Sequence, residues 1–139
     1  MRTLLRVGLI GTTATILLGA MAGVSWADTA SVSCFVGKDT NGLDCETWFK
    51  KDSGISVSHA VFTADGETLW VDDRYVDGRG VFLSASWGAN GYAQISATGG
   101  AGDSEGKDLS ITDGTTVHLK MCQTDNGSLL NCVYPNAIA

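Results

Sequence analysis

Apolar and polar residues alternate with a period of two along most of the chain that follows residue 30. The clearest unit spans 69–87, in which two alternating runs flank an acidic turn at Asp77-Gly78. In the second run Val81, Leu83 and Ala85 share one face, which is the pattern of a half-buried strand. Gly accepts a positive φ and Asp bonds its own backbone, so the chain can reverse at this turn. The unit therefore predicts two antiparallel strands.

The rest of the chain repeats this pattern in short runs separated by turns rich in Gly, Asp and Asn, and no helical stripe interrupts them after residue 27. Eighteen Gly and one Pro suit tight turns. The sequence predicts an all-β fold, an antiparallel, immunoglobulin-like β-sandwich of seven to nine short strands, with a small closed barrel as the alternative. Further strands are expected at 31–36, 45–50, 55–64, 92–98, 109–111, 116–122 and 129–134.

Two segments are less regular. Within 55–64 the inward face is expected to switch near His59 to Val61, as at a bulge or a bend between sheets. Segment 99–107 contains four Gly and is expected to be the most flexible loop. The residues expected to form the core are Val57, Val61, Leu69, Val81, Leu83, Ile95, Leu109, Val117 and Leu119.

Residues 1–27 have the organisation of an export signal. Arg2 and Arg6 form a basic start, 7–20 is uncharged and largely apolar, and Ser25-Trp26-Ala27 supplies the small residues that a signal peptidase reads. A retained membrane anchor is the alternative, but the apolar run is shorter than the ~20 residues that a spanning helix needs. We therefore expect cleavage after Ala27, which leaves one secreted, extracellular domain of residues 28–139.

All four cysteines lie in that mature part, and an even count in an exported chain implies disulfides. Cys34 and Cys45 flank one turn, while Cys122 and Cys132 flank another at Asn126-Gly127. Cross-strand neighbours in a hairpin are close enough to bridge, so the spacing favours the pairs Cys34–Cys45 and Cys122–Cys132. A zinc site is the competing interpretation, but its C-x₂₋₄-C spacing and nearby histidines are missing.

Charge narrows the choice of partner. Without Arg2 and Arg6 the mature chain has 7 Lys and Arg against 15 Asp and Glu, a net charge of −8. Nucleic acids and anionic membrane surfaces are themselves polyanions, so we expect neither as a partner. An acidic surface also serves solubility alone. We expect a monomer with an unknown protein or glycan partner and no membrane contact after signal cleavage.

No constellation in the sequence indicates catalysis. His59 and His118 lie in alternating strands beside no evident nucleophile, and the G-x-S-x-G elbow of serine hydrolases is absent. Glu46, Glu67, Asp72 or Asp77 could be paired for glycoside chemistry, but any acidic sandwich offers such pairs. We therefore assign no catalytic residue and do not expect an enzyme.

A metal site stays open at this stage. Asp72, Asp73 and Asp77 cluster beside Gly78, and oxygen-rich loops of this kind can hold Ca²⁺. The twelve-residue calcium loop with its terminal Glu is absent, and turn-forming aspartates explain the cluster equally well. No metal ligand or cofactor is assigned.

The aromatic residues are the candidates for ligand binding. Trp48, Trp70, Tyr75, Trp87 and Tyr92 are many large rings for 112 residues, and some of them must fill the core. Exposed rings near Asp and Asn can stack on sugar faces or contact a partner protein. On that basis Trp70, Tyr75 and Tyr92 are the predicted ligand-binding residues.

Segment 109–122 resembles the closing half of immunoglobulin-like and fibronectin-III-like sandwiches, in which a short strand, a Gly turn and a long alternating strand precede a final hairpin. Asp72-Asp73, Val76-Asp77-Gly78-Arg79 and the Cys122–Cys132 hairpin also resemble those of small secreted actinobacterial proteins, a mostly uncharacterised family. The resemblance implies a secreted sandwich and no particular activity. The Cys…Trp…Cys core of true immunoglobulin domains is absent, so it extends to the architecture only.

These observations favour a secreted, non-enzymatic binding or interaction module, with the cell envelope or a polysaccharide as candidate ligands. The alternative is a small secreted inhibitor or toxin-like effector that presents the 99–107 loop on a disulfide-stapled scaffold.

Overall fold

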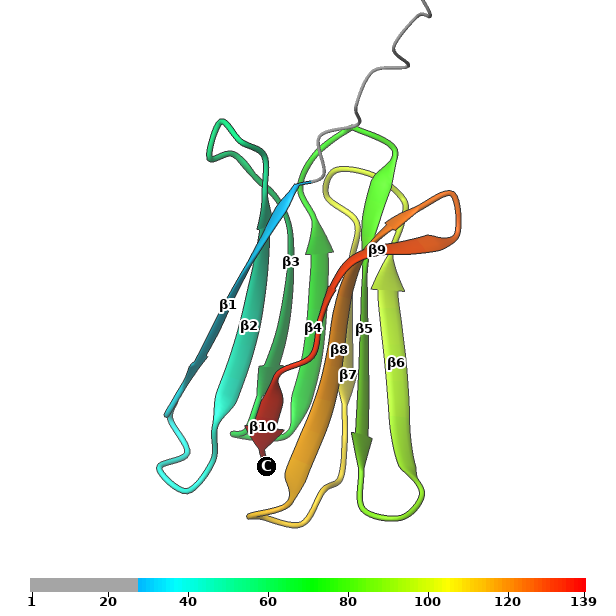
Figure 1. Cartoon of the computed structure of the whole chain (residues 1–139). Coiled ribbons are helices and arrows are strands. Elements are labelled where there is room, and N and C mark those ends of the chain that lie inside the picture. Colours follow the sequence, from blue (N-terminus) through cyan, green and yellow to red (C-terminus); the bar gives the residue numbers. More distant parts are fainter. Residues whose placement is uncertain (1–27) are drawn as a thin grey trace, which may run out of the picture.

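The computed structural model describes residues 28–139, and the regular secondary structure in this part of the chain consists of β-strands (Figure 1). The predicted export signal lies outside the described residues. Within 28–139 no helix is long and apolar enough to cross a membrane. The strands are β1 (Thr29–Phe35), β2 (Asp44–Lys50), β3 (Ser56–Thr63), β4 (Thr68–Asp73), β5 (Arg79–Trp87), β6 (Gly91–Ala97), β7 (Ser104–Asp108), β8 (Thr116–Asp125), β9 (Ser128–Val133) and β10 (Asn136–Ile138).

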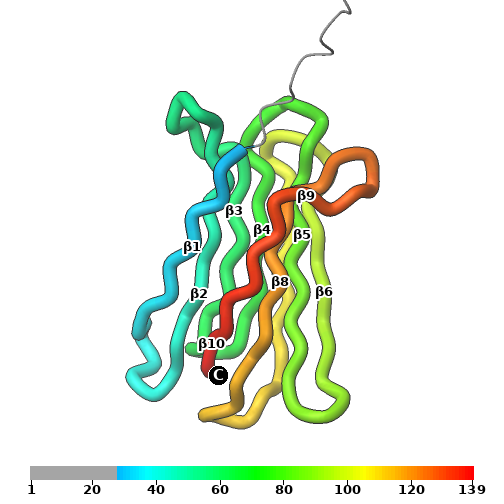
Figure 2. The backbone as a smooth tube through the Cα atoms, in the orientation of Figure 1, coloured from blue at the N-terminus to red at the C-terminus, as the bar shows by residue number. Residues whose placement is uncertain are grey.

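The ten strands form two antiparallel sheets of five, which confirms the predicted β-sandwich. The first sheet has the order β1-β2-β3-β4-β7, and the second has the order β10-β8-β5-β6 with β9 paired to β8. Figure 2 shows the consequence along the chain: the blue-to-green segment builds most of the first sheet, and the later segments build the second. Only β7 returns to the first sheet, where it pairs with β4.

Two strands were not predicted. All five residues of β7 are exposed, and its sequence Ser-Glu-Gly-Lys-Asp has no apolar residue that could alternate. The second half of the expected 99–107 loop is therefore a strand, held by its backbone pairing to β4. The three residues of β10 follow Pro135, where the last strand was expected to end. Conversely, 109–111 is not a strand, although Leu109 and Ile111 pack against the core.

The core lies between the inner faces of the two sheets, where Phe49, Phe62, Leu69, Leu83 and Met121 are the largest fully buried apolar side chains. Most of the predicted core residues belong to it. Val61 is the exception, because Ala60 and Phe62 on either side of it face inward. The change of inward face that was expected near His59 to Val61 also lies at a different position.

The irregularity in β3 occurs at Val57. Phe49 pairs with Ser58 and Lys50 pairs with Ser56, so Val57 is the additional residue of a bulge. Both Val57 and Ser58 are buried as a result. The bulge lies two residues before the predicted switch because the period of two continues undisturbed from Ser58 onward.

Both predicted disulfides are confirmed. Cys34 and Cys45 are directly opposite each other on β1 and β2, with Cα atoms 4.1 Å apart. Cys122 and Cys132 link β8 to β9, with Cα atoms 4.2 Å apart. All four cysteines are therefore used. Each bridge joins one strand of the sandwich to its hairpin partner.

Candidate functional site

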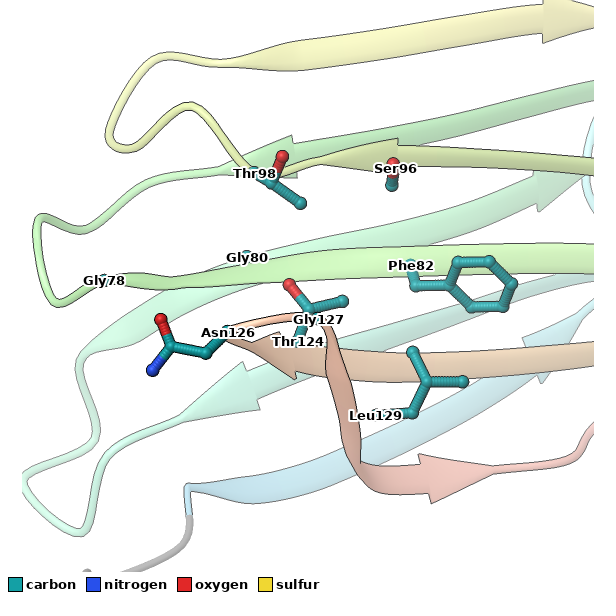
Figure 3. Close-up of a pocket in the computed structure, with 9 residues that line it drawn as sticks. All are labelled: Gly78, Gly80, Phe82, Ser96, Thr98, Thr124, Asn126, Gly127 and Leu129. Atoms are coloured by element: carbon teal, nitrogen blue, oxygen red, sulfur yellow. The ribbon is translucent and has the colours of Figure 1, made fainter.

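A groove of about 500 Å³ lies on the outer face of the second sheet, beside the hairpin that joins β8 to β9. Figure 3 shows its lining residues spread across three neighbouring strands and this hairpin. The side chains of β5, β6 and β8 that flank the lining positions point into the core, so the lining positions themselves face outward. The lining consists of Gly78, Gly80, Phe82, Ser96, Thr98, Thr124, Asn126, Gly127 and Leu129.

The floor of the groove is low because Gly80 has no side chain. Gly80 lies opposite Thr124 of β8, and its other neighbour in the sheet is the end of β6 at Ala97 and Thr98. A Cβ atom at position 80 would lie 2.3 Å from the carbonyl oxygen of Ala97 and 2.8 Å from Oγ1 of Thr124. The contact with the Ala97 oxygen is too short for an unshifted backbone, so any side chain at this position would push the strands apart. Gly80 therefore leaves a depression between the side chains of Thr98 and Thr124.

The β8–β9 hairpin supplies the wall. Asn126 and Gly127 have φ values of +48° and +82°, as a two-residue turn with both central residues in the left-handed region requires. The turn brings Leu129 opposite Thr124, at the rim of the groove. Two residues further along β5, Phe82 lies opposite Cys122 of the second disulfide. The hairpin predicted at Asn126-Gly127 thus shapes the groove.

The chemistry of the lining is polar and uncharged. Ser96, Thr98 and Thr124 contribute hydroxyl groups, and Asn126 contributes an amide. Phe82 and Leu129 contribute apolar surface. None of the nine lining residues carries a charge. Such a surface can exchange hydrogen bonds with a neutral polar ligand and cover one apolar face of it.

The three predicted ligand-binding residues do not come together. Tyr92 is 59% exposed and lies on the outer face of the second sheet, where its hydroxyl donates to Gln94 Oε1 at 2.8 Å. Trp70 is 43% exposed and lies on the outer face of the first sheet, with its ring over Gly106. Tyr75 lies between β4 and β5, partly buried against the core. Of the three, only Tyr92 shares a sheet face with the groove.

A polar cluster around His59 was not predicted as a unit. On the outer face of the first sheet, His59 Nε2 lies 3.0 Å from Glu46 Oε2 in a hydrogen bond. His59 Nδ1 lies 3.3 Å from Asp72 Oδ1, within ion-pair range but without hydrogen-bond geometry. Trp48 stacks on the imidazole with ring centroids 3.8 Å apart. The register Trp48↔His59↔Asp72 explains the cluster, and it appears only once the strands are paired.

This cluster holds the His59 imidazole between two carboxylates. Both ring nitrogens of His59 face carboxylates, so neither is directed toward a substrate. Arg74 donates a hydrogen bond to Asp72, and its guanidinium group lies over the Trp48 ring. The second histidine, His118, has Nδ1 2.7 Å from Asn136 Oδ1.

The three aspartates considered for calcium point in different directions. Asp72 faces His59 and Arg74, while Asp77 accepts a hydrogen bond from the backbone of Arg79 at 3.0 Å. Asp73 points inward, and burial raises the pKa of its carboxyl group. Among residues 28–139 no group of three His, Cys, Asp or Glu side chains could hold a metal ion. These carboxylates serve turns and ion pairs.

Comparisons with protein-family models, curated proteins and solved structures find no match for this chain. A functional inference therefore depends on the geometry and chemistry of the groove.

Proposed function

We propose that the mature chain is a secreted, non-enzymatic binding domain that holds a neutral saccharide in the groove of the second sheet. The observation that supports this proposal is the lining itself, in which hydroxyl and amide groups surround Phe82 and Leu129 without any charged side chain. A sugar ring presents hydroxyl groups at its edge and C–H groups on its faces. The lining offers partners for both.

Size and position support the same ligand class. A volume of about 500 Å³ lies within the range of roughly 300–1,000 Å³ that small-molecule sites occupy. The exposed row Tyr92, Gln94 and Ser96 continues from the groove along β6. A polysaccharide chain could therefore extend beyond the groove over the same sheet face, toward the ring of Tyr92.

A binding role fits this lining better than hydrolysis. Glycoside hydrolysis uses two carboxyl groups roughly 5–9.5 Å apart, one of which protonates the leaving oxygen. No Asp or Glu is among the lining residues of the groove. The two disulfides are compatible with an extracellular location, where a polysaccharide or a cell envelope would be met.

The inhibitor alternative receives no comparable support from the loop on which it depended. Only 99–103 remains a loop, since Ser104 begins β7. Asp103 Oδ2 accepts hydrogen bonds from the backbone N–H groups of Thr98 and Gly99 at 2.9 and 2.7 Å, which makes the turn tight. Before Asp103 the loop contains only Gly and Ala, so it has no large side chain to anchor in a partner.

The proposal is tested with the mature domain, refolded with both disulfides, against neutral and charged polysaccharides in affinity electrophoresis and calorimetry. We expect binding of a neutral saccharide, and Phe82→Ala should weaken it about tenfold, or ~1.4 kcal/mol, because the ring covers a sugar face. Trp70→Ala is the matched control on the opposite face and should leave the affinity unchanged.

Two results would contradict the proposal. If Trp70→Ala abolishes binding and Phe82→Ala does not, the ligand lies on the first sheet. If only charged polymers bind, the uncharged lining is not the recognition surface. Circular dichroism of each variant separates a lost contact from a lost fold.

A further inference from the structure

Strand β1 is an open edge of the first sheet. It pairs with β2 on one side, and no strand of residues 28–139 pairs with its other side. Figure 1 shows β1 at the margin of the first sheet, away from β5, β6 and β8. None of its seven residues is charged. Its N–H and C=O groups along the free side are thus available to another strand.

Apolar side chains are concentrated on this edge. Val32 is 41% exposed and Phe35 is 44% exposed, and Val36 directly after the strand is 61% exposed. Val32 lies opposite Thr47, which is buried on the inner face of β2. Val32 therefore faces inward, at a position that the second sheet covers only in part. The strand is open at its backbone and, around Val32, partly open on its inner face, while Ala30 packs against the core.

The other edge strands of the described sheets are β6, β7, β9 and β10. β9 is uncharged like β1, but an irregularity between Met121 and Gln123 interrupts its pairing with β8. β7 has Glu105, Lys107 and Asp108 among its five residues. The carboxylate of Glu105 also accepts a hydrogen bond from the backbone N–H of Ser96, and so occupies the edge of β6. β10 is only three residues long. Charges, short strands and covered edges are the usual means of preventing edge-to-edge pairing.

We infer that β1 is a self-association edge, at which two copies of this chain pair β1 with β1 in antiparallel orientation about a twofold axis at Val32. In this register Val32 meets the partner's Val32, and Ser31 meets the partner's Ser33. Hydroxyl groups then face each other on the outer face, and the two valines cover one another on the inner face. The first sheets of the two copies become one continuous sheet.

A second copy is favoured over a foreign strand by the composition of β1. Twofold pairing places the residue at the axis opposite its own copy, so a charge there would meet a like charge. The uncharged sequence Thr-Ala-Ser-Val-Ser-Cys-Phe is free of this repulsion. The Cys34–Cys45 bridge fixes β1 to β2, so the edge is already formed before a partner arrives. The inference differs from the sequence-based expectation of a monomer, and the mass measurement below decides between them.

One consequence rests on the proposed function. The twofold axis of an antiparallel edge pair is perpendicular to the sheet, so the outer faces of both second sheets point to the same side. Both grooves would then meet the same polysaccharide surface. Two weak contacts on one polymer raise the apparent affinity well above that of either alone.

The test is sedimentation equilibrium of the mature domain without saccharide, from about 5 μM to 1 mM, because an interface of one strand pair is small and weak. The average mass should rise from one chain toward two. Val32→Lys should stay at the mass of one chain at every concentration, since two ammonium groups would meet at the axis. Ser104→Lys adds the same charge to the opposite edge and should dimerise like the parent.

The register is tested with single spin labels at Ser33→Cys and Phe35→Cys. In the proposed pairing the two copies of residue 33 are offset by about 7 Å along the strand and those of residue 35 by about 20 Å. A constant one-chain mass, a dimer that survives Val32→Lys, or labels closer at 35 than at 33 would overturn the inference. Loss of saccharide binding with an intact dimer would instead contradict only the proposed function.

Discussion

Gln123 donates a hydrogen bond from Nε2 to Asp28 Oδ2 at 2.7 Å, although 95 residues separate the two in the chain. Gln123 is fully buried on β8, and Asp28 directly precedes β1. Arg79 donates to the same oxygen at 3.0 Å, and Asn131 donates to Gln123 Oε1 at 2.8 Å. The network joins the start of the first sheet to three strands of the second, and it satisfies polar groups that burial would otherwise leave unpaired.

Asp28→Ala is therefore expected to destabilise the domain by about 2–4 kcal/mol, because Gln123 Nε2 loses its buried acceptor and Arg79 loses a partly buried carboxylate. The measurement is urea unfolding followed by tryptophan fluorescence. Asp28→Asn is the matched control, since it keeps an acceptor oxygen and should lose less. Equal stability of Asp28→Ala and the parent would mean that the network contributes nothing to folding.

The fold could be predicted from the sequence wherever burial imposes alternation. In β5 and β6 the apolar face is buried, and the predicted core residues Val81, Leu83 and Ile95 are residues that the core contains. β7 could not be predicted in this way, because an edge strand without apolar residues is stabilised by backbone pairing alone. The buried hydrogen bonds of Asp28 could not be predicted either, because its partners Arg79 and Gln123 lie on strands far away in the sequence.

The two disulfides should differ in their effect on stability. Each closes a loop of ten or eleven residues, which the chain-entropy model values at about 3 kcal/mol. Cys122 is fully buried on a central strand, whereas Cys34 lies on the exposed edge strand β1. Replacement of both Cys122 and Cys132 by Ser should thus lower the melting temperature more than replacement of Cys34 and Cys45.

Circular dichroism during thermal unfolding measures this difference, and the two double variants control for each other. Neither should abolish the fold, because a domain of this size has roughly 5–15 kcal/mol of stability. If the variant at 122 and 132 melts at the parent temperature, β9 is not part of the cooperative unit.

Asp73 should make the domain less stable as pH rises from acidic values. Burial is the main cause of its raised pKa, and the side-chain atom Oδ2 has no hydrogen-bond partner in the described structure. A carboxyl group with a raised folded-state pKa stabilises the fold fully below its ordinary pKa, and this contribution is lost as pH rises through the raised value. Above that pH the folded state has a buried, incompletely paired charge.

Asp73→Asn should remove this pH dependence and stabilise the domain near pH 7. The Asn keeps an oxygen for the backbone N–H of Tyr75 and carries no charge to bury. Urea unfolding between about pH 3 and pH 7 gives the comparison, with Asp113→Asn as a control at an exposed turn. A parent and variant whose stabilities change in parallel with pH would exclude Asp73 as the source.

The candidate site was less predictable than the fold, because it depends on which residues become neighbours across the sheet. The aromatic residues drew attention to Trp70, Tyr75 and Tyr92, yet the structure places them on three different surfaces. Most of the groove lining consists of Gly, Ser and Thr residues, which carry little information in a linear sequence. Its one local signal was Asn126-Gly127, whose turn geometry could be predicted while its position beside Phe82 could not.

A substitution at Gly80 tests both the packing of the sheet and the shape of the groove. Gly80→Ala adds one methyl group that would lie 2.3 Å from the Ala97 carbonyl oxygen, a backbone atom that cannot rotate away. The strands β5 and β6 must separate locally, so we expect a loss of about 2–4 kcal/mol and a much weaker affinity for the saccharide. Thermal unfolding and calorimetry measure the two effects.

Gly106→Ala is the matched control, because its added methyl group meets the side-chain ring of Trp70, which can shift at the surface of the first sheet. This variant should keep its saccharide affinity, since it lies on the face opposite the groove. A Gly80→Ala protein with parent stability would show that β5 and β6 are not held as closely as the structure has them. A Gly80→Ala protein that is destabilised but binds saccharide with parent affinity would place the ligand outside the depression between Thr98 and Thr124.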